Sequence, residues 1–510
     1  MSQATATPKT ALQKLLDMVE RVGNRVPHPA VLFFALMALI ILLSLVLAGV
    51  SVSYQRINPE THKAEEVSTV IRSLISSDGI AFIFTSMVSN FINFGPVGII
   101  LVAMIGVGLA EQAGLIGALI RKIVVVAPPK AMTPIIVALG VVSSIASDAG
   151  YLVLIPLGAA AFLSMGRHPL VGLAAAFAGV AAAFGVNFLV KPIDGILAEM
   201  TTDAVHLVDP SRTVDLTANY YFGVASSIVL ILVCWLVTDW IVEPRMGLYE
   251  GESPGGKKQG LSADEARGLF YALIAGLIVI VVLALLSLPS GAPLRNPQTG
   301  DLIGNSPFMN SLVVLIMIVF LVTGAAYGIG AKTIRSTQDG IDAVTKTFSE
   351  LGGLLFLFFV ISQFVAYFNY SNIGTILAVN LANLLKQADL GSVPLLLGFI
   401  LIGFVLCFPL PNILPKWAIM APIFVPLFLK LGIGPDVVLA AYRVSDSPPN
   451  VINPLLPHFA LVVGFARVYE KKAGVGTIVA LMLPYTLATS IAWILVFVAW
   501  YLLGLPFGPG

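Results

Sequence analysis

Long apolar stretches alternate with short polar segments along the whole chain. A stretch such as "AVLFFALMALIILLSLVLAGV" (Ala30 to Val50) is long enough for one helix to cross a bilayer about 30 Å thick. The pattern predicts an all-α polytopic membrane protein. We expect nine transmembrane helices, at 30–50, 82–118, 169–189, 219–242, 268–288, 310–331, 347–369, 436–458 and 474–503.

Two further apolar stretches, 131–165 and 391–430, are each interrupted midway. Lys and Arg accumulate in cytoplasmic loops, so the basic clusters indicate orientation. The clusters are Arg21/Arg25, Arg121/Lys122/Lys130, Arg245/Lys257/Lys258/Arg267, Lys332/Arg335/Lys346 and Arg467/Lys471/Lys472. All five lie inside only if neither interrupted stretch crosses the membrane. We therefore predict two re-entrant hairpins that enter from opposite faces, with the N-terminus inside and the C-terminus outside.

This topology divides the chain into two transmembrane halves. Residues 1–29 form an amphipathic, cytoplasmic N-terminal segment that we expect to lie flat on the inner surface. The first half, 30–243, contains the hairpin 131–165, and a cytoplasmic loop, 244–267, follows it. The second half, 268–510, contains the hairpin 391–430.

Composition narrows the class of protein. The 510 residues are 58% hydrophobic and 11% charged, with a net charge of +1, which indicates lipid as the surroundings and gives no reason to expect a nucleic-acid partner. The histidines show no metal-ligand spacing, and there is no glycine-rich phosphate loop, so we expect no cofactor and no ATP-driven step. An intramembrane aspartyl protease needs two facing aspartates in recognisable motifs, which Asp148 and Asp446 do not provide. We predict a protein that is not an enzyme.

The two halves contain a repeat. Without a gap, a shift that places residue 151 on residue 417 aligns 151–190 with 417–456. The matches include Gly166 on Gly432, Pro169 on Pro435 and Asn187 on Asn453. One copy begins with the inner hairpin and the other with the outer hairpin, so the copies are inverted about the membrane plane. Inverted repeats with broken helices are typical of secondary transporters, whose site lies near the midplane.

The segment "AAYRVSDSPPNVINPLLPHF" (Ala440 to Phe459) predicts one such break. Pro448 and Pro449 remove two backbone donors, so the helix should end there. Unwound backbone at membrane depth is tolerated where it lines a cavity or is buried in protein. The freed carbonyls, with Asn450 and Asn453, offer groups that a small substrate or a cation needs.

Arg443 and Asp446 are three residues apart, so they lie on one helix face and can pair. Charged residues inside a membrane are costly and usually functional. The pair either locks two helices together or provides a substrate-anion site at Arg443 and a proton- or ion-coupled carboxylate at Asp446.

Three other polar positions have two interpretations each. Ser147 and Asp148, at the tip of the first hairpin, either coordinate a coupling ion or cap helices. Trp417, at the second tip, is either an interfacial anchor or an aromatic wall of the site. Asp194 either closes the cavity opposite Arg443 or faces water from a loop.

Long motifs identify the chain as similar to the aminobenzoyl-glutamate transporter (AbgT) family over nearly its whole length. They include "NFGPVGIILVAMIGVGLAEQAGLI", "SDAGYLVLIPLGAAAF", "VTDWIVEPRMG", "SQFVAYFNYSNIG", "KWAIMAPIFVPLF" and "AAYRVSDS". The resemblance implies a homodimer in the bacterial cytoplasmic (inner) membrane, with nine spans and two hairpins in each subunit. It implies uptake of p-aminobenzoyl-glutamate or export of sulfonamide-type antimetabolites, driven by an ion gradient. The family's functional positions correspond to Asp194, Trp417, Pro435, Arg443, Asp446 and Pro454.

Three stretches depart from the family pattern, namely "VAAAFGVN" (180–187), "NILPKW" (412–417) and "SDSPPN" (445–450). Each replaces hydroxyl-bearing or small residues beside the expected site, which weakens the case for a sodium site built from hydroxyl groups. The coupling ion, proton or sodium, therefore stays open, as do the direction of transport and the exact substrate. An ion or small-anion channel, or a transporter of another carboxylate, is the alternative.

Overall fold

The computed structural model describes residues 29–57, 64–145, 150–249, 261–303, 306–387 and 391–509. The predicted amphipathic segment 1–29 lies outside the described residues except for its last residue. So do residues 250–260 of the predicted loop 244–267.

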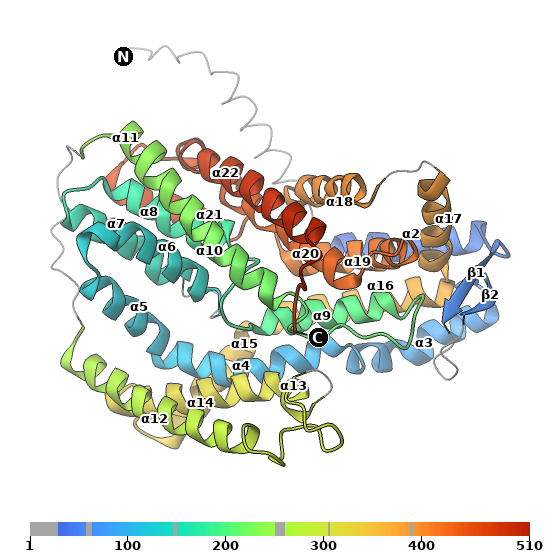
Figure 1. Cartoon of the computed structure of the whole chain (residues 1–510), viewed down its shortest axis with the longest axis horizontal. Coiled ribbons are helices and arrows are strands. Elements are labelled where there is room, and N and C mark those ends of the chain that lie inside the picture. The colour runs from blue at the N-terminus through green and yellow to red at the C-terminus, as the bar shows by residue number, and fades with distance from the viewer. Residues whose placement is uncertain are drawn as a thin grey trace, which may run out of the picture.

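The first half of the chain begins with a helix and a β-hairpin and continues as short and long helices (Figure 1). Its elements are α2 (Pro29–Val46), β1 (Ser51–Ile57), β2 (Ala64–Val70), α3 (Ser77–Ile92), α4 (Gly95–Ala113), α5 (Leu115–Val126), η1 (Pro129–Ala131), α6 (Met132–Ser143), η2 (Gly150–Leu154), α7 (Ile155–Ser164), α8 (Pro169–Phe177), η3 (Ala178–Ala182), α9 (Pro192–Val205), α10 (Tyr220–Val237), η4 (Thr238–Val242) and α11 (Glu243–Met246).

In the second half, all the regular elements among the described residues are helices. Its elements are α12 (Ala263–Ser287), α13 (Pro307–Asn310), α14 (Leu312–Ala331), α15 (Thr337–Glu350), α16 (Gly352–Ser371), α17 (Ile373–Gln387), α18 (Ser392–Cys407), α19 (Ile413–Lys430), α20 (Pro435–Asp446), η5 (Pro448–Ile452), α21 (Phe459–Tyr469) and α22 (Val475–Leu502). The segments η1 and η5 are 3₁₀ turns, and η2, η3 and η4 are single π-helical turns.

Eight helical stretches within the described residues are long and apolar enough to cross a membrane: Pro29–Val46, Ser77–Ala113, Tyr220–Met246, Ala263–Ser287, Leu312–Ala331, Gly352–Ser371, Ile413–Lys430 and Val475–Leu502. Seven of them coincide with predicted spans, and the eighth is the second arm of the predicted hairpin 391–430. The spans 169–189 and 436–458 are both interrupted, and the break predicted at Pro448 is present. The first stretch leaves helical geometry after Ala182, and the second breaks after Asp446.

The structure contains one small β-sheet that the all-α prediction did not include. Strands β1 and β2 pair in antiparallel register, with Ser51 opposite Val70 and Ile57 opposite Ala64. The sequences "SVSYQRI" and "AEEVSTV" combine β-branched residues, which favour strands, with polar ones. The hairpin lies at one end of the molecule, beside α17 (Figure 1).

Helices α12, α14 and α4 pack side by side along one edge of the molecule (Figure 1). Their close approach depends on small residues, because a Cβ added to Gly106 of α4 would lie 2.0 Å from the Met317 carbonyl oxygen of α14. Small residues at helix contacts are typical of membrane bundles. Only 11% of the most apolar 18-residue stretch of α12 is buried, so this helix presents most of its surface outward.

The local structure repeats at the shift found in the sequence. Helix α7 ends in a turn at Gly166 (φ 74°), and α19 ends in a turn at Gly432 (φ 81°). The Gly166 N–H donates to the carbonyl of Leu163, and the Gly432 N–H donates to that of Leu429. Positive φ favours glycine, which explains why these two positions match. Each turn leads into a helix that starts with proline, Pro169 in α8 and Pro435 in α20.

The two turns are anchored differently. Arg167, in the first turn, donates hydrogen bonds to Asp239, Glu243 and Thr133, and its guanidinium lies 4.0 Å from the centre of the Phe162 ring. At the equivalent position of the second turn stands Ile433, a buried hydrophobic residue. The first turn is therefore fastened to η4 and α11 by charge, and the second is held by apolar packing.

Candidate transport site

The breaks of the two repeats meet inside the protein. After η3 the chain leaves helical geometry, and after α20 it passes through the 3₁₀ turn η5, where Pro448 cannot donate a backbone hydrogen bond. The N–H of Gly185, in the first break, donates to Ser447 Oγ in the second at 2.8 Å. The Gly185 carbonyl accepts from Arg443 Nη1 at 3.2 Å. Two elements that are far apart in sequence thus bond directly to each other.

One asparagine in each repeat fastens its break in the same way. Asn187 Nδ2 donates to the carbonyl of Val141 at 2.9 Å, and Asn453 Nδ2 donates to that of Cys407 at 2.8 Å. The side-chain oxygen of each asparagine accepts from the N–H two residues further on, at 3.1 Å and 3.0 Å. Val141 and Cys407 are themselves equivalent under the repeat. These bonds satisfy backbone groups at helix ends that lipid could not satisfy.

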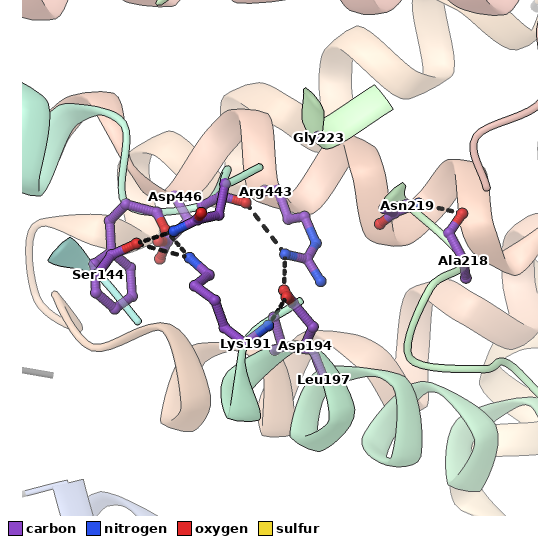
Figure 2. Close-up of polar contacts among 12 residues, drawn as sticks. Ser144, Lys191, Asp194, Leu197, Ala218, Asn219, Gly223, Arg443 and Asp446 are labelled. Atoms are coloured by element: carbon purple, nitrogen blue, oxygen red, sulfur yellow. Dashed lines mark hydrogen bonds and ion pairs between the residues drawn. The ribbon is translucent and has the colours of Figure 1, made fainter. Parts of the chain in front are cut away.

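An arginine–aspartate pair joins the two repeats. Arg443 Nη1 lies 2.6 Å from Asp194 Oδ1, and the side chains are 8% and 12% exposed. The other carboxylate oxygen of Asp194 accepts from the backbone N–H of Lys191 at 2.8 Å, as an acidic residue in the first turn of a helix commonly does. The start of α9 therefore fixes this carboxylate in front of the guanidinium (Figure 2).

Asp446 pairs with a different cation. Its Oδ1 lies 2.7 Å from Lys416 Nζ, both side chains are 0% exposed, and the two atoms form an ion pair without regular hydrogen-bond angles. The pairing of Arg443 with Asp446 that their spacing allows does not form. Three residues rotate an α-helix by about 300°, so the two side chains diverge by about 60° and reach partners on different neighbours.

Lys191 is a further buried cation, which the sequence interpretation missed. Its Nζ donates to the Phe184 carbonyl at 2.6 Å and to Ser144 Oγ at 3.2 Å, and the side chain is 1% exposed. It extends toward Ser144, away from the Arg443–Asp194 pair (Figure 2). The sequence did contain a signal for this residue, because a lysine beside a break at membrane depth is costly and is therefore usually functional.

A narrow cavity opens beside Arg443. It is lined by Gly185, Val186, Asn187, Leu189, Val190, Asp194, Leu216, Asn219, Tyr220, Phe222, Gly223, Arg443 and Trp493. Two buried polar atoms on its lining residues, Arg443 Nε and Asn219 Oδ1, have no hydrogen-bond partner. Its free volume, about 20 Å³, has room for about one water molecule. The cavity thus offers a donor, an acceptor and aromatic walls, and a larger ligand needs the surrounding elements to move apart.

A model of the AbgT putative transporter family matches residues 14–510. The chain belongs to the AbgT transporter family. It is 36% identical to the p-aminobenzoyl-glutamate transport protein of Escherichia coli (strain K12), over 100% of this chain and 99% of the relative. The resemblance predicted from the motifs is therefore confirmed, and with it a multi-pass membrane protein that is a transporter and not an enzyme.

Two solved structures of transporters are similar to this AbgT protein. The Alcanivorax borkumensis YdaH transporter has a TM-score of 0.89 and 38% identity, over 95% of this chain and 100% of the other. Neisseria gonorrhoeae MtrF, whose structure is described for a class of antimetabolite efflux pumps, has a TM-score of 0.89 and 39% identity, over 97% of this chain and 99% of the other. The arrangement of helices in this AbgT chain is thus that of solved transporters.

Of the site residues predicted for this AbgT protein, Asn187, Asp194 and Arg443 line the cavity. Trp417 does not: it is fully buried, stacks on Tyr442 with ring centres 4.4 Å apart, and donates to Thr201 Oγ1 at 3.1 Å. The aromatic residues on the lining are Tyr220, Phe222 and Trp493. These three and Asn219 carried no sequence signal, because nothing in their local pattern separates them from ordinary residues of a span.

The other predicted positions lie deeper in the breaks. Asn450 and Asn453 are buried around Cys407, whose thiol donates to Asn450 Oδ1. Pro435 and Pro448 begin α20 and η5, and Pro454 follows Asn453 at the end of the unwound segment. Ser147 and Asp148 lie outside the described residues. Within the described residues, no three His, Cys, Asp or Glu side chains group as a metal site would require.

Proposed function

We propose that this chain is a secondary transporter that moves p-aminobenzoyl-glutamate or a related aromatic carboxylate across the bacterial inner membrane by alternating access, driven by an ion gradient. Export of sulfonamide-type antimetabolites is the alternative, with transport in the opposite direction. The protein acts as a homodimer of subunits with nine crossings and two opposed re-entrant hairpins. Its N-terminus is inside and its C-terminus outside.

The observation that carries this proposal is the pair of unsatisfied polar atoms beside aromatic walls. Arg443 gives one face of its guanidinium to Asp194 and Gly185, while its Nε has no partner. A guanidinium binds a carboxylate through two parallel N–H donors, so a substrate carboxylate fits this side of Arg443. Asn219 Oδ1 can accept from an amide or amine N–H, and Trp493 or Tyr220 can pack against a ring.

The recurring Asn187 and Asn453 bonds support an alternating-access mechanism. Two repeats inverted about the membrane plane can exchange conformations, so that the site opens first to one side and then to the other. A cavity that holds about one water molecule is closed to a substrate of this size, so one of the hairpins must move for binding. Trp417 and Tyr442, stacked behind the site, would move with the hairpin arm α19.

Coupling to an ion gradient requires a group whose occupancy changes during the cycle. Asp194 and Asp446 are candidates for a proton, and Ser147, Asp148 and Asp446 are candidates for a sodium ion. A membrane potential supplies about 2.3 kcal/mol for each charge and each 100 mV, so one or two coupled ions are enough for substantial accumulation.

The test is flux of radiolabelled p-aminobenzoyl-glutamate into proteoliposomes under separately imposed proton and sodium gradients. A transporter shows saturable uptake, accumulation against the substrate gradient, and accelerated exchange when unlabelled substrate is present inside. A channel shows neither accelerated exchange nor saturation. Flux without accelerated exchange, or flux that does not saturate, would reject the proposal. The double variant Arg443→Gln, Asp194→Asn is the matched negative control, because it removes both charges of the pair together.

A further inference from the structure

The charges buried around the two breaks do not balance. Two carboxylates, Asp194 and Asp446, are paired with Arg443 and Lys416. Lys191 is equally buried, and no carboxylate of the described residues lies within ion-pair distance of it. With every group ionised, the cluster holds three positive and two negative charges, a net charge of +1.

The Lys191 ammonium occupies an oxygen-lined position between two elements that must move relative to each other. Its Nζ bonds the Phe184 carbonyl, in the first break, and Ser144 Oγ, at the end of hairpin helix α6. The ring of Phe184 lies 5.0 Å away. The charged groups that act on it are Asp194 from α9 and Arg443 and Asp446 from α20.

We propose that Lys191 is the proton-coupling site of this transporter, and that its protonation and the binding of an anionic substrate favour each other. The inference rests on the proposed function, because it assigns the driving ion and the direction of coupling to the same site. Removing the Lys191 proton brings the buried charge to zero. Adding an anion at Arg443 makes the cluster more negative and so holds the proton on Lys191.

The linkage is reciprocal, so a bound proton strengthens anion binding by the same factor. Proton and substrate therefore cross together, and an inward proton gradient drives uptake. The amine also controls the contact between α6 and the first break. The neutral amine keeps two N–H donors for Ser144 and Phe184 but loses the positive charge that strengthens both hydrogen bonds, so proton loss weakens this contact.

The experiment compares wild-type protein with Lys191→Met and with Lys346→Met, which removes an exposed lysine (65% exposed side chain). The probe is p-aminobenzoyl-glutamate in proteoliposomes with the voltage clamped at zero. A pH difference of one unit supports about tenfold accumulation when one proton accompanies each substrate. We expect this accumulation in wild type and Lys346→Met and its loss in Lys191→Met. Lys191→Met should still exchange substrate, because Lys191 does not line the cavity, but with a higher KM, because the proton that strengthens anion binding is absent. Proton-driven accumulation by Lys191→Met would overturn the proposal.

A second measurement needs no substrate. The melting temperatures of the three purified proteins are recorded between about pH 6 and pH 10, across which a perturbed lysine titrates. The difference between wild type and Lys191→Met should change with pH, while that between wild type and Lys346→Met should not. A pH-independent difference at Lys191 overturns the proton site. If wild type fails to carry the probe while this pH dependence is present, the proposed substrate is wrong and the proton site stands.

Discussion

Arg443 and Asp194 are 249 positions apart in the chain, yet their guanidinium and carboxylate are separated by 2.6 Å. Asp194 belongs to the first turn of α9 and Arg443 to α20, so this contact joins the two halves at the cavity, together with the hydrogen bonds of Gly185. It also fixes the side of Arg443 that remains available to a ligand.

Removing Arg443 alone should reduce both stability and transport. Arg443→Gln leaves the Asp194 carboxylate buried without its partner, and breaking such a pair costs about 3–5 kcal/mol. Adding Asp194→Asn should restore most of the stability, because no charge is then unpaired, while saturable uptake stays absent. Thermal unfolding in detergent measures the first effect and proteoliposome uptake the second. Normal uptake by the double variant would show that Arg443 does not bind substrate.

The Lys416–Asp446 pair allows a similar separation of roles deeper in the protein. Lys416→Met should destabilise by about 3–5 kcal/mol, and Lys416→Met with Asp446→Asn by much less, since an apolar or neutral replacement avoids the unpaired charge. Transport by the stable double variant then shows whether the Asp446 carboxylate is needed for ion coupling. Full ion-driven uptake by that variant would make the pair a structural lock between α19 and α20.

Asn187 and Asn453 should contribute alike to stability. Replacing either with Ala leaves a buried carbonyl and a partly buried N–H without their partner, which costs about 1–3 kcal/mol. Asn310→Ala, at an exposed position of α13, is the control and should change the melting temperature little. A large loss of stability on replacing only one of the two asparagines would mean that they contribute unequally to the stability of the two repeats.

Gly106 and Gly98 lie in the same helix but in opposite surroundings. A Cβ at Gly106 meets the backbone of α14 at 2.0 Å, whereas a Cβ at Gly98 meets no atom within 4 Å. Gly98→Ala should be neutral or stabilise by up to about 1 kcal/mol through helix propensity. Gly106→Ala should separate α4 from α14 and lower the melting temperature. Equal effects of the two substitutions would contradict this packing.

Tryptophan fluorescence can identify the aromatic wall of the site. Trp493 lines the cavity, and Trp417 is stacked on Tyr442 away from it. A bound aromatic carboxylate should therefore quench Trp493 fluorescence, and the signal should vanish in Trp493→Phe and persist in Trp417→Phe. The reverse result would place the substrate ring at Trp417, as the sequence interpretation proposed.

The breaks and the repeat were predictable because they depend on the backbone. Proline removes a donor and glycine permits positive φ wherever they occur, so Pro448, Gly166 and Gly432 marked their positions without any knowledge of neighbours. The matched asparagines fasten equivalent carbonyls, which explains why they coincide in the alignment.

The partners of the charged side chains were not predictable in the same way. Spacing along α20 allowed Arg443 to reach Asp446, but packing brought Asp194 and Lys416 nearer. Lys191 and Asn219 owe their environment to the way that the break, α6 and α20 fold together. Such contacts depend on tertiary structure, and a single sequence does not specify them.

Under the proposed alternating-access mechanism, the unequal turns bear on how the free energies of the two access states compare. A perfect inverted repeat would relate the inward-open and outward-open forms by a two-fold rotation about an axis in the membrane plane, so their free energies would be equal. Arg167 holds its turn with two carboxylates, whereas Ile433 makes no such bond, so inversion does not map this molecule onto itself. The substrate-free transporter should therefore favour one of the two states before any gradient is applied, namely the state in which the side of the charged Arg167 turn is closed.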